Sequence, residues 1–126
     1  MAKGWTTSPT LFADQIEADL ATRVRVIAMA MLNEVVLRSP VDTGRFRGNN
    51  IVSIGAPVYA QTGKVDPTGA ATISDGVSEL SGLEPFTVVY IQNNLPYAER
   101  LENGHSKQAP SGIYGLAFIG VSEAYK

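Results

Sequence analysis

The amino-acid sequence predicts a single α+β domain spanning residues 1–126, in which a long N-terminal helix and a C-terminal helix pack on a small, mostly antiparallel β-sheet, with an extended loop or arm. Three observations lead to this class. A long N-terminal stretch has apolar residues at helical spacing, two short segments in the middle are rich in β-branched residues, and a second helical pattern closes the chain. A chain of this length fits one domain with one core.

The first helix is expected to follow a tail of residues 1–8. Ser8 can cap the free amides of the first turn, and Pro9 suits the first helical position, where no N–H donor is needed. The helix should end before Pro40, which disfavours the helical conformation at Ser39. Its apolar residues recur every three or four positions and predict one buried face, made of Leu11 or Phe12, Ile16, Leu20, Val24, Ile27, Met31 and Val35. Further apolar residues in the second half of this helix predict that this half is covered on two sides, by the sheet and by a neighbouring subunit.

The middle of the chain predicts one strand, an arm and a short helix. Residues 50–55 contain β-branched residues in alternation and are expected to form the strand. Residues 56–72 are rich in Gly, Pro, Ser and Thr and are expected to form an arm or hairpin. Ile73, Val77 and Leu80 keep helical spacing, so a short helix is expected over 73–82, ended by Gly82.

The second half predicts a strand and two helices. Residues 86–92 have the clearest strand composition and are expected to lie centrally in the sheet. Residues 95–104 are expected to form a short helix, with Pro96 near its start and Gly104 just past its end. Pro110 can begin a last helix that runs to Tyr125, with one side made of Ile113, Leu116, Ala117 and Val121.

Composition excludes several classes of function. The formal charge of −2 argues against nonspecific nucleic-acid binding by the whole surface. The absence of cysteine excludes disulfides, zinc–thiolate sites and thiol nucleophiles. His105 is the only histidine and has neither a cysteine nor a nearby cluster of carboxylates with which to bind a metal. It is expected in a surface loop, and we expect neither metal nor cofactor. No apolar run is long enough to span a bilayer and no signal peptide is recognisable, which predicts a cytoplasmic chain. The low charge content, 17%, leaves neutral surface that suits subunit contacts.

Asp42, Thr43 and Gly44 form the tripeptide that carries the catalytic carboxylate of aspartic proteases. In a dimeric protease, two facing Asp42 carboxylates would share a proton and activate water. Against this, the protease fold is almost wholly β and its tripeptide follows an apolar strand, whereas here it follows a helical pattern and a proline. The alternative interpretation is a turn, in which Asp42 accepts hydrogen bonds and Gly44 supplies an unusual backbone angle.

Two groups of charged residues have alternative interpretations. Arg38, Arg45 and Arg47 form a small basic cluster that could contact DNA phosphate or an acidic partner surface, or could be solvated arginines beside a turn. Glu99 and Glu102 are spaced like one face of a helix, so we expect them to be solvated or to contact another subunit rather than to act as paired catalytic carboxylates.

Two distant segments together carry a recognisable pattern. Residues 39–47 read SPVDTGRFR, and a second group reads YIQNNLPYA at 90–98, LENG at 101–104 and SKQAP at 106–110. This pairing, in this order, resembles the neck or tail-completion proteins of long-tailed double-stranded DNA phages, the minor tail protein Z type, over about residues 10–125. That family often has Trp where this chain has Asn50 and an aromatic residue where it has His105.

The resemblance implies an α+β structural subunit without catalytic activity. It would form a homomeric ring, a hexamer being favoured and a dodecamer the alternative, that joins tail to head and surrounds the DNA passage. The partners would be neighbouring head-completion and tail proteins, with nonspecific contact to passing DNA. The location would be the virion neck or tail, after assembly in the host cytoplasm, and a tail-terminator role is the alternative. The expected assembly residues are Asp42, Gly44, Arg45, Arg47, Pro96, Tyr97, Leu101, Glu102, Gly104, Ser106 and Lys107.

Overall fold

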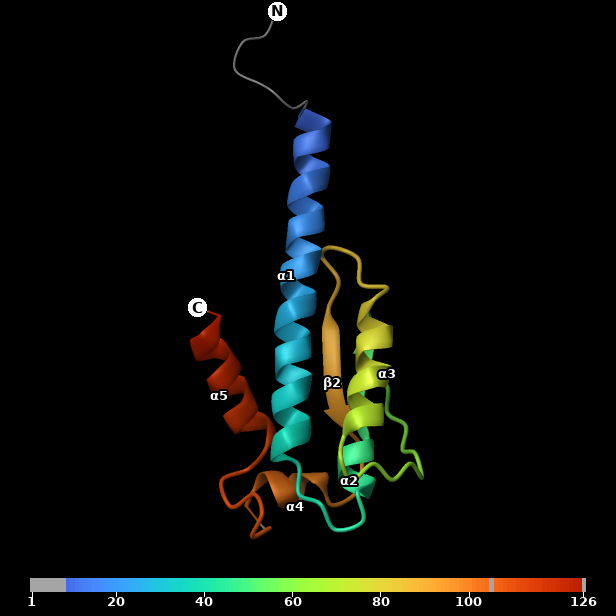
Figure 1. Ribbon diagram of the computed structural model, residues 1–126, viewed down its shortest axis with the longest axis vertical. Coiled ribbons are helices and arrows are strands. Elements are labelled where there is room, and N and C mark those ends of the chain that lie inside the picture. The colour runs from blue at the N-terminus through green and yellow to red at the C-terminus, as the bar shows by residue number, and fades with distance from the viewer. Residues whose placement is uncertain (1–8, 105, 126) are drawn as a thin grey trace, which may run out of the picture.

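A computed structural model describes residues 9–104 and 106–125, and its fold is α+β, as predicted (Figure 1). The predicted tail, residues 1–8, and His105 lie outside the described residues. The elements in chain order are α1 (Pro9–Arg38), α2 (Arg45–Gly48), β1 (Asn50–Ile54), α3 (Ala70–Leu80), β2 (Val89–Asn93), α4 (Ala98–Glu102) and α5 (Tyr114–Ala124).

Helix α1 ends where the sequence predicts, at Arg38, and Ser39 closes its last turn. The Ser39 hydroxyl donates to the carbonyl of Val35 at 2.7 Å, and its amide donates to Val36 at 3.2 Å. Helix α1 is about 45 Å long at ~1.5 Å per residue, and its N-terminal part extends beyond the rest of the molecule (Figure 1). The predicted buried face is therefore wrong for this part, because Leu11 and Ile16 are 60% and 49% exposed.

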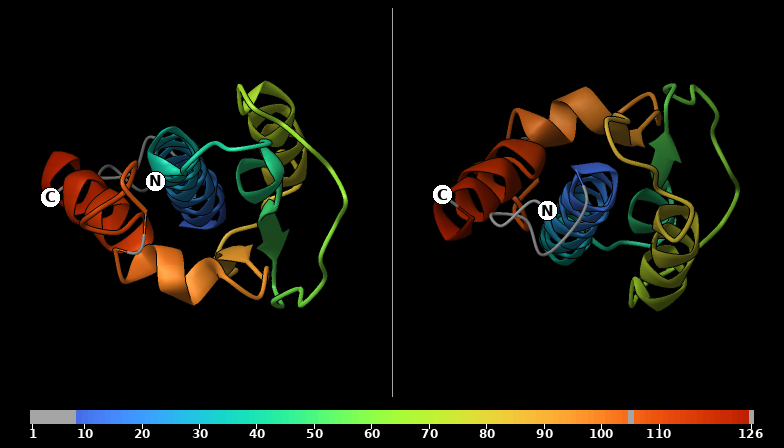
Figure 2. Two further views of the ribbon diagram at one scale, coloured as in Figure 1. Left: turned by 90° about the horizontal axis from the view of Figure 1, so that it is seen from below. Right: turned by 90° about the horizontal axis from the view of Figure 1, so that it is seen from above.

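The second half of α1 lies between two hydrophobic clusters. On one side, Val35 belongs to a cluster that α5 and the 95–109 segment complete, made of Val35, Phe46, Leu95, Ala109, Ile113 and Ala117. On the other side, α3 and β1 complete a cluster made of Ala28, Leu32, Val36, Val52 and Leu80. The cover on two sides is confirmed, but α5 supplies the side that the sequence assigned to a neighbouring subunit (Figure 2).

The sheet has two antiparallel strands, with Asn50 paired to Asn93 and Ile54 paired to Val89. Strand β2 is therefore an edge strand, and its predicted central position is wrong. It also begins three residues later than predicted. Phe86 has a φ of 62° and a side chain that is 79% exposed, so the chain is still turning at the expected strand start.

Residues 56–69, which we call the strap, connect β1 to α3 without regular secondary structure. The predicted arm ends too late at 72, and the predicted helix begins too late at 73, because α3 starts at Ala70. The strap is held against the body by side-chain amides. The amide of Asn94 donates to the carbonyls of Val58 and Ala60 at 2.7 and 3.0 Å, and Gln92 accepts from the Val58 amide at 2.8 Å. It is a bound segment rather than a free arm.

Helix α5 begins at Tyr114, four residues after the predicted start at Pro110. Gly112 adopts a φ of 93°, which is outside the helical range, so the helix cannot include it. The predicted inner side is otherwise confirmed, since Ile113, Ala117 and Val121 are buried and Leu116 is half-buried. Helix α4 is confirmed within the predicted range, with Gly104 just past its end. In the described part of the chain, no helix has the length and apolar character needed to cross a membrane.

Candidate assembly site at the meeting of two distant segments

The segments 39–48 and 95–110 meet at the end of the molecule that carries α2 and α4 (Figure 1). The Gln108 side chain joins them. Its Oε1 accepts the Val41 amide at 2.8 Å and its Nε2 donates to the Val41 carbonyl at 2.9 Å, so one side-chain amide satisfies both main-chain groups of a distant residue. Beside this junction lies a hollow of about 300 Å³, which we call the basal hollow, lined by Pro40, Asp42, Thr43, Gly44, Arg45, Phe46, Tyr97, Leu101, Ser106 and Gln108.

Gly44 supplies the unusual backbone angle that the sequence predicts, with a φ of 93°. The strap passes directly over it. A Cβ at this position would lie 2.5 Å from the Pro67 nitrogen, which is closer than real Cβ atoms approach. The Gly44 carbonyl also accepts the Asp66 amide at 2.9 Å. Gly44 is therefore the point at which the strap is anchored to the turn.

Asp42 is exposed at the rim of the basal hollow, after the end of α1 rather than after a strand. The hydrogen-bond acceptor in this turn is Thr43, whose hydroxyl oxygen accepts the Arg45 amide at 3.3 Å. The turn interpretation therefore assigned the acceptor to the wrong residue. The α+β fold also differs from the almost wholly β fold in which aspartic proteases carry this tripeptide.

The three arginines of the predicted basic cluster have different surroundings. The Arg47 guanidinium donates to the main-chain carbonyls of Pro67 at 2.8 Å, Ser39 at 2.9 Å and Leu37 at 3.4 Å. It thus links the strap to the C-terminal end of α1. Arg38 pairs with Glu34 at 3.1 Å on the helix surface, whereas Arg45 is exposed. The cluster is therefore not one basic patch, because Arg47 is committed to its own chain.

Glu102 caps the N-terminus of α5. Its carboxylate accepts the amides of Ile113 at 2.8 Å, Tyr114 at 2.9 Å and Gly115 at 2.7 Å, which are donors that the first helical turn leaves unpaired. The expected solvated role is wrong for Glu102, because its carboxylate binds an intrachain helix end eleven or more residues away, whereas the alternative contact with another subunit stays a prediction. Glu99, on the same helix, is exposed as expected.

Tyr114 connects this cap to the sheet. Its hydroxyl donates to Oδ1 of Asn50 at 2.8 Å. Burial raises the pKa of the Tyr114 phenol, and the nearby Glu102 charge adds to that effect. The phenol therefore stays protonated and keeps its donor role.

The remaining predicted residues are placed around the basal hollow in different ways. The Tyr97 ring lies over Phe46 with ring centroids 6.1 Å apart, and Leu101 packs against the Val35 cluster. Ser106 shapes the loop, since its carbonyl accepts the Ala109 amide at 3.2 Å. Pro96 and Lys107 are exposed, and neither lines the hollow. The structure thus gathers Asp42, Gly44, Arg45, Tyr97, Leu101 and Ser106 at one hollow, with Arg47, Pro96, Glu102, Gly104 and Lys107 outside its lining.

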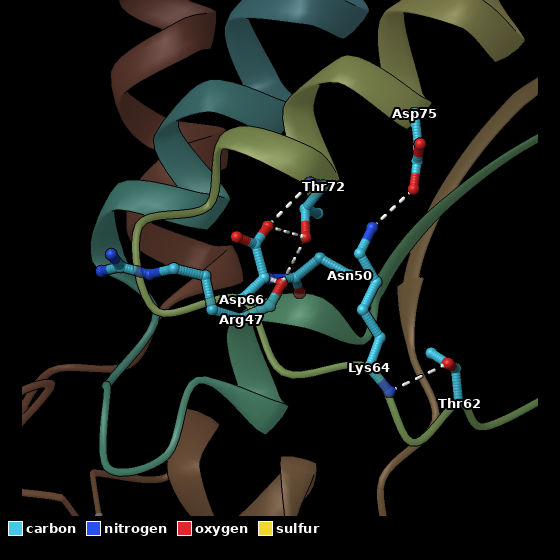
Figure 3. A network of polar contacts seen from close by, with 7 residues as sticks. All are labelled: Arg47, Asn50, Thr62, Lys64, Asp66, Thr72 and Asp75. Carbon is cyan, nitrogen blue, oxygen red and sulfur yellow. Dashed lines mark hydrogen bonds and ion pairs between the residues drawn. The ribbon is translucent and has the colours of Figure 1, made fainter.

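Asp66 fixes the start of α3 and was not expected from the sequence (Figure 3). Its Oδ2 accepts both the amide and the hydroxyl of Thr72, each at 2.7 Å. Burial would raise the pKa of this carboxyl, but the hydrogen bonds from Thr72 and the charge of Lys64 outweigh it, so the pKa lies below its ordinary value. Lys64 also pairs with Asp75 at 2.5 Å, which attaches the strap to α3.

Asparagines at the ends of the two strands were also missed. Asn49 is fully buried, and its side chain both accepts from and donates to the main chain of Thr62, at 2.9 and 3.0 Å. Asn50 bonds Ser39 at 3.0 Å, and Asn93 bonds the Phe46 carbonyl at 2.8 Å. The signal available in the sequence was the repeated Asn-Asn doublet at 49–50 and 93–94, one at the end of each strand.

Comparison with protein-family models, with curated proteins and with solved structures finds no match to this chain.

Proposed function

We propose that this chain is a structural virion protein of the head–tail neck or tail-completion region of a long-tailed phage. It forms a homomeric ring that joins tail to head and surrounds the DNA passage, and it acts by forming interfaces rather than by chemistry. One observation carries the proposal. The two distant segments whose pairing resembles the neck and tail-completion family form one face, joined by the two hydrogen bonds between Gln108 and Val41.

The shape of the subunit supports the same role. A ring subunit needs elements that reach its neighbours, and the N-terminal part of α1 extends beyond the body with exposed apolar side chains such as Ile16 (Figure 1). Apolar side chains are also exposed on α5, where Phe118 and Ile119 are 64% and 60% accessible. Such residues are typical of surfaces that are covered on assembly.

Imaging tests this proposal directly. Electron microscopy of the purified protein should show closed rings, with six subunits favoured, and phage particles that lack the chain should accumulate unjoined heads and tails. The position of the protein in complete particles separates the neck from the tail-terminator role. Normal virions in the absence of the chain would contradict the proposal, as would hydrolysis of a peptide that Asp42→Asn abolishes.

A further inference from the structure

One end of the molecule carries an apolar stripe bordered by negative charge. Residues 9–22, the projecting segment of α1, include three acidic residues and no Lys or Arg. Ile16 is 49% exposed, and Leu20 lies one turn further along the same side. Successive helical residues are about 100° apart, so Glu17 and Asp19 fall on opposite flanks of this stripe. Both carboxylates are exposed.

The opposite end carries the complementary arrangement. The basal hollow is lined by the apolar side chains of Phe46 and Leu101 and by the ring of Tyr97. Arg45 stands in its lining, and Lys107 lies between Ser106 and Gln108, which also line it. The rest of its lining is polar and includes the Asp42 carboxylate, so the hollow joins an apolar part to a polar part with cations beside it. The end of the molecule that carries the hollow, with α2 and α4, lies opposite the projecting segment (Figure 1).

Most cationic side chains in the described chain have a partner within the same molecule. Arg23, Arg25, Arg38, Arg47 and Lys64 each donate to a carbonyl or carboxylate of their own molecule.

Within residues 9–104 and 106–125, the cationic side chains left without such a partner are Arg45, Arg100 and Lys107, and all three lie at the base. Asp42 and Glu99 are exposed at the same end, which also holds the Arg47 guanidinium and the Glu102 carboxylate, so cations outnumber carboxylates there by four to three.

We propose that the projecting segment of one copy docks in the basal hollow of the next copy. The Ile16 and Leu20 stripe would cover the apolar lining, and Glu17 and Asp19 would face the partner-free basal cations. This inference rests on the proposed homomeric ring and names its interface. The contact joins two unlike surfaces, so its repetition closes into a ring when the rotation between copies divides a full turn and carries no rise along the axis.

Charge reversal on each surface tests the docking. The first variant, Glu17→Lys with Asp19→Lys, and the second, Arg45→Glu with Lys107→Glu, should each weaken self-association more than about tenfold, because like charges then face one another. An equimolar mixture of the two variants should restore assembly, since copies in alternating order pair opposite charges at every interface. Glu79→Lys with Glu84→Lys, at exposed positions outside both surfaces, is the matched control.

Size-exclusion chromatography with light scattering measures assembly, and circular dichroism establishes that each variant is folded like the wild type. Three results would overturn the docking and leave the proposed ring in place. They are rings formed by either charge-reversed variant alone, a mixture of the variants that stays dissociated, and a control that dissociates as the variants do. A wild-type chain that stays monomeric at every concentration would overturn both the docking and the homomeric ring.

Discussion

Many joints of this fold are bonds from a polar side chain to the main chain of a distant segment. Gln108 bonds both main-chain groups of Val41, and Asn49 does the same with Thr62. Glu102 binds the first amides of α5, and Arg47 holds three carbonyls. Because the partner groups belong to the main chain, such a bond does not depend on which side chain stands at the partner position.

Glu102 provides a test of a single residue. Glu102→Ala removes the acceptor of three helix-start amides and should lower the free energy of unfolding by about 2 kcal/mol, measured by urea denaturation. Glu99→Ala, at an exposed position on the same helix, should change it by less than about 0.5 kcal/mol. Equal effects of the two substitutions would contradict the capping role.

Gly44 provides a second test at this scale. Gly44→Ala places a Cβ against the strap main chain and forces a non-glycine residue to a φ of 93°, so we expect a loss of about 3 kcal/mol or more. Gly63→Ala is the matched control, because no atom lies within 4 Å of a Cβ there. In a thermal melt, a lower melting temperature for Gly44→Ala than for Gly63→Ala would support the role of Gly44 in anchoring the strap. Equal melting temperatures would argue against that role.

At the scale of elements, periodic patterns were predictable and tertiary restraints were not. The end of α1 and the place of β1 follow from apolar spacing and from Pro40, which act locally. The start of α5 depends on Glu102, and the path of the strap depends on Asn49 and Asp66. These three residues belong to no periodic pattern, so the sequence did not indicate their partners. The sequence paired the two segments only as a motif, so neither the grouping of Asp42, Tyr97 and Leu101 at one hollow nor the bond between Gln108 and Val41 was expected.

The junction of strap and α3 should depend on pH. The pKa of Asp66 is lowered in the folded chain, so its ionised form stabilises the fold above the unfolded carboxyl pKa of about 4, and this contribution is lost as pH falls through the lower folded value. Asp66→Asn should therefore destabilise at neutral pH and flatten the acid side of the stability profile, measured by urea denaturation between pH 2 and 7. Asp75→Asn removes a carboxylate that pairs with Lys64 at the surface, and should change the stability profile little.

At the scale of the whole molecule, α1 divides into a half that carries the core and a half that projects from the body (Figure 1). The half that lies between α5 and α3 carries the core, including the buried Leu32 and Val36, whereas the projecting segment is mostly exposed up to its end near the buried Ala21. The body can therefore fold around one half of the helix while the other half remains available to a neighbour. This division explains why a helix of this length suits so small a domain.

The division predicts opposite effects of two substitutions in one helix. Ile16→Ser should leave the unfolding free energy of the subunit within about 0.5 kcal/mol of wild type, because its side chain is half exposed. Leu32→Ala should cost about 2–5 kcal/mol, because its side chain is 1% exposed. Both are measured by urea denaturation of dilute, monomeric protein, and a large loss for Ile16→Ser would show that the projecting segment belongs to the core.

The amide pairing of Gln108 with Val41 and of Asn49 with Thr62 has an evolutionary consequence. Each amide bonds only peptide groups of its partner, so these contacts do not depend on the side chains at positions 41 and 62, whereas positions 108 and 49 require residues that both donate and accept. Remote homologues of this chain should therefore share isolated Asn and Gln positions in otherwise divergent loops. Hydrolysis of either amide to an acid would replace a donor with a charge beside a carbonyl and would therefore weaken the joint that the amide makes.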